Sequence, residues 1–236
     1  MRKRRVRIIP RLIIFTKVPR PGEVKTRVAA TVGKGRAAEI YRAILSGFIA
    51  RLRPLRRKWQ VEIHYSPADQ EFYLIPDVPL TIPRIPQCDG DLGARLTAAF
   101  AAAFNVRRDP VVICGTDSPD IPIPHIRDAV DKLSQYDVVL GPCTDGGFYL
   151  VGLARPTPGL FDGIEWSTPK VLEMTRQKAQ ALGLSCHLLP EWQDLDTVED
   201  VLAFLAKAPT DPRVKRIQNR IRATLQGVVE LPPPVV

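Results

Sequence analysis

Short apolar runs alternate along the chain with longer segments in which apolar residues recur every three or four positions. The short runs, rich in Val and Ile and bounded by turn residues, predict buried strands, whereas the wider spacing predicts helices with one apolar face. In residues 33–53, for example, Ile40, Ile44 and Phe48 share such a face. Strands are predicted over residues 11–16, 59–66, 110–115, 137–141, 148–153 and 185–189, and helices over residues 33–53, 91–104, 124–133, 167–182 and 197–206.

This alternation indicates an α/β fold with a mainly parallel sheet that is covered by helices on both faces. A chain of 236 residues, 45% of them hydrophobic, is long enough for one such domain. We predict a basic N-terminal extension over residues 1–10, the α/β domain over residues 11–208 and a partly helical C-terminal appendage over residues 209–236. The basic stretch of the appendage, DPRVKRIQNRIRATLQ, is predicted to form a surface helix.

The net charge of +9 is unevenly distributed, because residues 1–58 contain 18 Lys and Arg but only 2 Asp and Glu. Such an asymmetry indicates either an anionic partner or a solvated basic face. The chain has no zinc-finger or aromatic RNA-binding signature, so no specific nucleic-acid partner is expected.

The apolar segments and the cysteines limit the class of protein further. No segment has the roughly 18 uninterrupted apolar residues that a membrane-spanning helix requires. Pro10 and Arg11 interrupt the apolar stretch after the basic head, and no small-residue cleavage site follows it. The four cysteines are far apart and form no C-x-x-C pair, which argues against a disulfide framework or a zinc site. A cytoplasmic protein without a membrane span is therefore expected.

Polar turns follow several of the predicted strands, and in open parallel sheets ligands bind beyond the carboxyl ends of the strands. The first of these turns, KVPRPGEVKTR, combines stiff prolines with cations suited to phosphate oxygens. It lacks the nucleoside-triphosphate P-loop signature, and an ordinary solvated loop is an equal alternative. The phosphate-binding candidates in this turn are Lys17, Gly22, Lys25, Thr26 and Arg27.

Carboxylates follow two further strands and are candidates for a divalent metal. Asp117 comes directly after the strand PVVICG, where a hard oxygen ligand suits Mg²⁺ or Mn²⁺. Asp194 and Asp196 alternate in a strand-like DLD segment, so both are expected to point toward the same metal. The alternative is that Asp117 caps a turn and that the DLD segment only precedes a helix start at Thr197.

Another glycine-rich turn, CTDGGFYL, follows the predicted strand 137–141. Gly146 and Gly147 would let a substrate lie against the backbone, with Asp145 accepting a hydrogen bond from a hydroxyl or a base edge. An Asp-Gly hairpin turn is the alternative.

A nucleotide subsite is predicted around the start of helix 91–104, where helix N-termini favour anions. Its candidates are Gln87, Gly90, Asp91 and Arg95, although Asp91 alone is also a suitable helix cap. Trp166 is a candidate wall of the acceptor pocket, and a core tryptophan is an equal alternative.

Five motifs occur in one order: K-x-P-x-P-G-x-V-K-T-R, Q-x-x-G-D-L-G-x-R, G-T-D-S-P, G-P-x-x-D-G-G-F-Y-L and D-L-D-T-x-E-D. From about residue 12 to 206 the chain therefore resembles the bacterial nucleotide-diphospho-sugar transferase-like family. Its members are described variously as glycosyltransferase-A-type domains of unknown function, selenodomain-associated transferases and arsenosugar-biosynthesis glycosyltransferases. More distantly, the chain is similar to molybdenum-cofactor nucleotidyltransferases and phospholactate guanylyltransferase, whose basic loop also ends in Lys-x-Arg.

The resemblance implies a Rossmann-like three-layer α/β/α sandwich of the glycosyltransferase-A type. It also implies that Lys25 and Arg27 bind phosphates and that Asp117 binds the metal with Asp196 as its partner. The expected function is metal-dependent glycosyl transfer from a nucleotide-diphospho-sugar to a small-molecule acceptor, with Asp117, Lys25 and the acceptor-orienting Asp145 as catalytic residues.

One departure from the resemblance favours a second function. Thr-Asp-Ser stands where many glycosyltransferases have D-x-D, which leaves a single aspartate at that turn. The alternative is a nucleotidyltransferase that joins a nucleoside monophosphate to a phosphorylated acceptor and releases pyrophosphate. A non-catalytic nucleotide or nucleic-acid binder is a lesser alternative.

Overall fold

The computed structural model describes residues 8–68, 78–209 and 211–234, so most of the predicted N-terminal extension lies outside the described residues. The strands are β1 (Arg11–Lys17), β2 (Gln60–Ser66), β3 (Arg84–Pro86), β4 (Val111–Cys114), β5 (Val138–Pro142), β6 (Phe148–Leu153) and β7 (Cys186–Leu188). The α-helices are α1 (Thr26–Val32), α2 (Lys34–Arg51), α3 (Leu92–Val106), α4 (Ile123–Lys132), α5 (Val171–Ala181), α6 (Val198–Ala206) and α7 (Pro212–Leu225). A short 3₁₀ helix spans Leu55–Arg57.

The strands form one sheet in the order β3-β2-β1-β4-β6-β5-β7. All pairings are parallel except those of β6, which runs antiparallel to β4 on one side and β5 on the other. A tight turn between β5 and β6 causes this reversal. The predicted mainly parallel sheet is confirmed.

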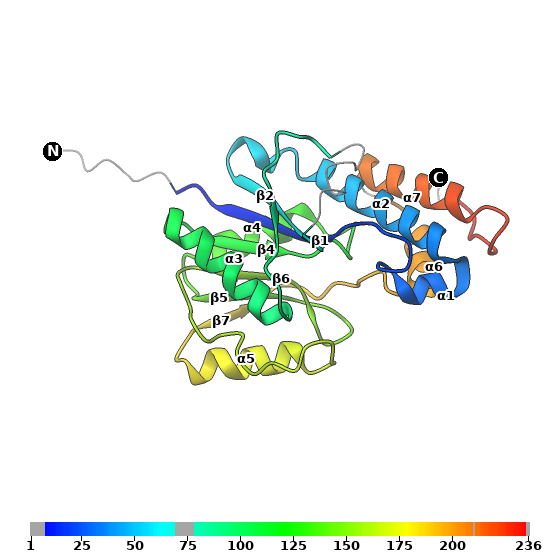
Figure 1. The fold of residues 1–236 in the computed structure, drawn as a ribbon. Coiled ribbons are helices and arrows are strands. Elements are labelled where there is room, and N and C mark those ends of the chain that lie inside the picture. The colour runs from blue at the N-terminus through cyan, green and yellow to red at the C-terminus, as the bar shows by residue number, and fades with distance from the viewer. Residues whose placement is uncertain (1–7, 69–77, 210, 235–236) are drawn as a thin grey trace.

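Helices cover both faces of the sheet and form the outer layers of an α/β/α sandwich (Figure 1). Side chains alternate along a strand, so Leu12 and Ile14 of β1 enter one core cluster and Ile13 enters another. The first cluster is closed mainly by α2 and α4, and the second by α3 and α5. The predicted α/β class and three-layer arrangement are confirmed.

Helices α1, α2, α6 and α7 share a third apolar cluster beside the sheet. Helix α7 lies in the predicted C-terminal appendage and packs against α2, where Ile217 covers Gly47 so closely that a Cβ there would lie 2.2 Å from Ile217 Cγ1. Buried Arg51 of α2 pairs with Asp211 at the start of α7 and donates to the carbonyl oxygens of Pro119 and Ile121. This basic helix is therefore a packed element with only its outer face in solvent.

Apart from the short 3₁₀ helix, two elements were not predicted. Helix α1 begins inside the segment interpreted as a phosphate-binding turn, and its sequence TRVAATV is rich in β-branched residues that favour helices weakly. Strand β3 has three residues and ends in proline, which is tolerated because it lies at the sheet edge. Within the residues described, no helix is long and apolar enough to span a membrane.

Candidate active site

A cavity of about 560 Å³ lies at the edge of the sheet where β1 and β4 end. Its volume is in the range of small-molecule sites. Eight of the predicted site residues line it: Lys17, Lys25, Thr26, Arg27, Gln87, Arg95, Asp117 and Asp196. The strand-end argument thus brings together residues from the first turn, the β4 turn and the DLD segment.

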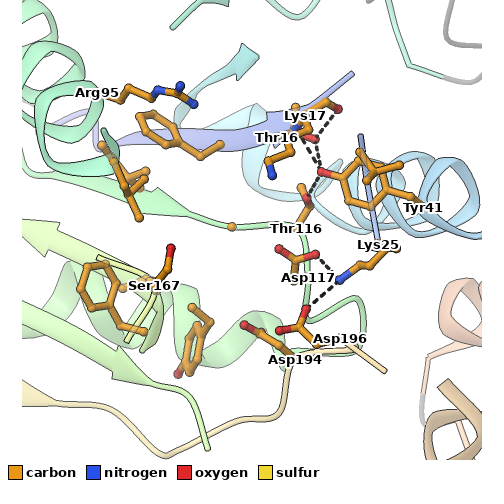
Figure 2. A pocket seen from close by; sticks show the side chains of 18 of the residues that line it. Thr16, Lys17, Lys25, Tyr41, Arg95, Thr116, Asp117, Ser167, Asp194 and Asp196 are labelled. Carbon is orange, nitrogen blue, oxygen red and sulfur yellow. Dashed lines mark hydrogen bonds and ion pairs between the residues drawn. The ribbon is translucent and has the colours of Figure 1, made fainter. Parts of the chain in front are cut away.

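Lys25 forms the centre of the charged end of this cavity (Figure 2). Its ammonium makes an ion pair with Asp117 and lies 3.3 Å from Oδ1 of Asp196. The Lys25 side chain is only 3% exposed, whereas the two carboxylates are 44% and 43% exposed. Burial by itself lowers the pKa of Lys25, but the two carboxylates raise it above its ordinary value, so the ammonium remains charged.

The backbone of Lys25 is left-handed, with φ 47° and ψ 49°, directly before α1. A non-glycine residue in this region is strained by roughly 1–3 kcal/mol, and such strain is often found at functional sites. The conformation directs the long side chain inward to the carboxylates instead of outward to solvent.

Tyr41 of α2 connects the ends of β1 and β4 beneath the charged end of the cavity. Its hydroxyl lies 2.9 Å from the hydroxyl oxygens of Thr16 and Thr116 and accepts a 3.0 Å hydrogen bond from the Lys17 N–H. Its ring is 4% exposed. Tyr41 is not among the site residues predicted from the sequence, because nothing in the helix period shows where its hydroxyl goes.

Asp194 and Asp196 both line the cavity, although the DLD segment is not a strand. The Leu195 side chain between them is buried, and its N–H donates to the Asp117 carbonyl oxygen at 2.9 Å. Asp194 accepts from the Ser118 hydroxyl and from the Cys143 thiol. Burial and then the charge of Asp117 raise the pKa of Asp194 to about 6.

The other end of the cavity is mainly apolar, with Arg95 and Ser167 beside it (Figure 2). Gln87 is held with its amide nitrogen donating to the His64 carbonyl oxygen at 2.8 Å, which fixes the side chain. Arg95 donates to the Gly90 carbonyl oxygen and to Ser66 Oγ. The apolar lining, which was not predicted from the sequence, includes Phe15, Leu92, Leu96, Ile113, Phe148, Leu150 and Val151.

Asp145, Gly146 and Gly147 do not line the cavity. They form the β5–β6 hairpin, in which the Asp145 carboxylate is exposed and accepts from the Gly147 N–H at 2.9 Å. Gly146 has φ +86°, and a Cβ there would lie 2.0 Å from the Pro169 carbonyl oxygen, so close packing against residue 169 requires glycine. The hairpin alternative therefore describes the geometry of this turn.

The other predicted residues that lie outside the cavity are Gly22, Gly90, Asp91 and Trp166. Asp91 caps α3 by accepting from the Ala94 N–H at 2.8 Å. Trp166 covers Gly93 of α3, where a Cβ would lie 2.8 Å from its Nε1. These residues position α3 and its neighbours, while the adjacent Ser167, with φ 62°, lines the cavity itself.

The carboxylates suit a hard divalent cation only in part. Among the residues that the structure describes, no three His, Cys, Asp or Glu side chains gather as a metal-binding group. Mg²⁺, however, is commonly held by one or two carboxylates together with substrate phosphates. Asp117 and Asp196 fit that requirement, since both are partly exposed in the cavity and bind one cation, the Lys25 ammonium.

Comparison with solved structures shows that the chain is similar to a provisionally assigned nucleotide-diphospho-sugar transferase from Desulfovibrio desulfuricans G20. It shares 32% identity with a TM-score of 0.77, over 91% of this chain and 97% of that one. The inositol-1-phosphate CTP transferase of T. maritima shares 12% identity with a TM-score of 0.53, over 94% of this chain and 98% of that one. A cytidylyltransferase from Leptospira borgpetersenii serovar Hardjo-bovis (strain JB197) shares 14% identity with a TM-score of 0.52, over 95% of this chain and all of that one.

The two cytidylyltransferase matches show a shared fold alone, and the comparison with curated proteins found no match. A family model described as "Uncharacterized protein conserved in bacteria (DUF2064)" matches residues 51–168. Together with the D. desulfuricans protein, this match confirms the nucleotide-diphospho-sugar transferase-like resemblance and the glycosyltransferase-A type of sandwich. The chain belongs to the bacterial DUF2064 family.

Proposed function

We propose that the protein is a metal-dependent transferase that uses a nucleotide-activated donor, and most specifically that it transfers a glycosyl group from a nucleotide-diphospho-sugar. The observation that carries the proposal is the pairing of Lys25 with Asp117 and Asp196 in a cavity of nucleotide size at the strand ends. A buried cation between two partly exposed carboxylates suits a polyphosphate and its counter-ion better than it suits a purely structural ion pair.

The charged end of the cavity would hold the diphosphate. Lys17, Lys25 and Arg27 supply permanent positive charge for its oxygens and would stabilise the negative charge that develops on the leaving group. Asp117 and Asp196 would hold Mg²⁺ or Mn²⁺ together with phosphate oxygens. When bound, such an ion acts as a Lewis acid that neutralises charge on the transferring phosphates or the leaving diphosphate.

The apolar end would hold the less polar part of the donor. Phe15 and Phe148 offer ring surfaces, and Gln87 and Arg95 offer polar groups that the backbone already orients. Asp145, although outside the cavity, is a proposed acceptor-orienting residue, since its exposed carboxylate lies three residues before the cavity-lining Phe148.

Nucleotidyl transfer is a second candidate, and a specific observation favours it. The turn at Thr116, Asp117 and Ser118 has one aspartate, and Ser118 uses its hydroxyl to hold Asp194. In this reaction the same cations would hold the pyrophosphate that leaves from a nucleoside triphosphate, while the nucleoside monophosphate stays on its acceptor.

The products separate the two candidates. The enzyme with Mg²⁺ or Mn²⁺ is incubated with a panel of nucleotide-diphospho-sugars and a pool of small-molecule hydroxyl acceptors, and separately with each nucleoside triphosphate and a sugar-phosphate pool. Release of nucleoside diphosphate supports glycosyl transfer, and acceptor-dependent release of pyrophosphate supports nucleotidyl transfer. Asp117→Asn should abolish either reaction, whereas Asp131→Asn, at an exposed position on α4, should leave it intact. No product and no nucleotide binding in any mixture would contradict the transferase proposal.

A further inference from the structure

Lys25 occupies the carboxylate oxygens that a metal ion would need. Its ammonium pairs with Oδ1 of Asp117 and with Oδ1 of Asp196, and these two contacts bring the carboxylates together around a single cation. A divalent ion held by both oxygens would meet the ammonium at close range. Two cations in that space repel each other, and little solvent screens them because the Lys25 side chain is almost fully buried.

The ammonium has an alternative set of partners within the same cavity. Lys25 carries a point charge on a flexible four-carbon stem, so its charge can move several ångströms while its backbone stays fixed. Phosphate oxygens beside Lys17 and Arg27 would offer it full negative charge, and Lys17 and Arg27 line this cavity together with Lys25. The strained left-handed backbone of Lys25 keeps the side chain aimed inward in either position.

We propose that Lys25 is a tethered counter-cation that excludes a divalent metal from Asp117 and Asp196 until nucleotide phosphates draw its ammonium away. This inference rests on the proposed function, since it requires that a nucleotide binds in the cavity. In the free protein the lysine neutralises the two carboxylates, and in the bound protein the metal replaces it there. The Lys25 ammonium therefore pairs with the carboxylates first and with the phosphates afterwards.

The exchange makes metal and nucleotide binding interdependent. If nucleotide raises the affinity for the metal by a given factor, the metal raises the affinity for the nucleotide by the same factor. Direct metal–phosphate contacts contribute to that factor in any such site. The part that Lys25 contributes should disappear when its charge is removed.

The test measures Mn²⁺ binding by isothermal titration calorimetry in the full chain, without nucleotide and with saturating CDP, GDP, UDP or ADP. Without nucleotide, Lys25→Met should bind Mn²⁺ at least about tenfold more tightly than the wild type, because a unit charge beside the ion has been removed. With nucleotide, the wild type should gain affinity for Mn²⁺, and Lys25→Met should gain at least about tenfold less.

Lys17→Met is the matched control, because it removes a lysine of the same cavity for which no contact with either carboxylate is seen. It should leave the nucleotide-free affinity for Mn²⁺ within about threefold of wild type, because the repulsion between a lysine charge and the ion weakens with distance and with screening. An equal gain in Mn²⁺ affinity in Lys17→Met and Lys25→Met would show a general charge effect and would overturn the role of Lys25. Lys25→Arg, which keeps the charge, should behave as the wild type.

The outcomes separate this inference from the proposed function. If the wild type binds Mn²⁺ and nucleotide together but Lys25→Met gains no metal affinity, only the role of Lys25 is wrong. If no protein binds Mn²⁺ with any nucleotide, the proposed function fails and the inference fails with it. If Lys25→Met does not fold, Lys25→Gln replaces it with the same expected Mn²⁺ affinities, and equal Mn²⁺ affinities of the wild type with and without nucleotide overturn the inference.

Discussion

Replacing Tyr41 by Phe tests whether one buried hydroxyl holds the charged end of the cavity together. The substitution keeps the ring, which is 4% exposed, and removes an oxygen that contacts Thr16, Thr116 and the Lys17 N–H. The fold should survive, since the apolar packing of the ring with Val24 and Ala38 is unchanged. The ends of β1 and β4, however, lose their common partner.

The loss of stability follows from the groups that no longer have the Tyr41 hydroxyl as a hydrogen-bond partner. Leaving a buried donor or acceptor unsatisfied costs about 1–3 kcal/mol. Thr16 already has the Lys17 carbonyl oxygen as a second partner at 3.3 Å, so the loss falls mainly on the Lys17 N–H and the Thr116 hydroxyl. We expect a total loss of about 2–4 kcal/mol in the free energy of unfolding. For a chain of this length that corresponds to a fall in Tm of roughly 4–16 °C.

The assay combines urea unfolding with nucleotide binding in the presence of Mn²⁺. Tyr41→Phe should lose nucleotide affinity as well as stability. The lost hydroxyl contacts Lys17 and Thr116, and Lys17 and Asp117, which follows Thr116, are both proposed to bind the ligand. Tyr136→Phe, which removes a hydroxyl from a half-buried ring after α4, should change neither by more than about 0.5 kcal/mol. If Tyr41→Phe also stays within that limit, the hydroxyl does not organise the site.

Two further predictions concern the contacts between α2 and α7. Burial raises the pKa of Asp211, but a backbone N–H and Arg51 outweigh it and lower the pKa below its ordinary value. The stability that ionised Asp211 contributes is fully present above its ordinary pKa and is lost as the pH falls through the lowered pKa. In urea unfolding from about pH 5 to pH 2, Asp211→Asn should therefore show a smaller fall in the free energy of unfolding than the wild type. In thermal unfolding, Gly47→Ala should lose about 1–3 kcal/mol of stability, because its new methyl group overpacks against Ile217. Gly35→Ala, at the start of the same helix, has open space around the methyl group and should be neutral or stabilising by up to about 1 kcal/mol. Equal stabilities for the two alanine variants would contradict the packing argument.

The fold and one half of the site were predictable because they depend on local patterns. Apolar runs gave the principal strands, and the rule that ligands bind beyond strand ends brought Lys25, Asp117 and Asp196 into one cavity. The same rule failed to show what the β5–β6 turn does, because an Asp-Gly sequence serves a hairpin and a binding turn equally well. In the structure Asp145 belongs to the hairpin and lies outside the cavity.

The remaining features depend on contacts between residues far apart in the sequence. Tyr41 fits the apolar face of a helix, and only the packing of α2 on the sheet places its hydroxyl between Thr16 and Thr116. Trp166 likewise packs on α3 only because Gly93 leaves room there for its ring. A periodic pattern identifies such residues as buried but does not say which element they meet.

The direction of β6 explains why the cavity has two chemically different ends. Strands β1 and β4 reach the site edge with their last residues, so polar turn residues such as Asp117 follow them there. Strand β6 runs the other way and begins at that edge, so it contributes its own first side chains, Phe148 and Leu150, in place of a turn. An antiparallel strand between β4 and β5 therefore adds an apolar surface beside a charged one. That arrangement suits a ligand in which a charged diphosphate adjoins a less polar group, as in a nucleotide-diphospho-sugar, whose diphosphate lies between a nucleoside and a sugar.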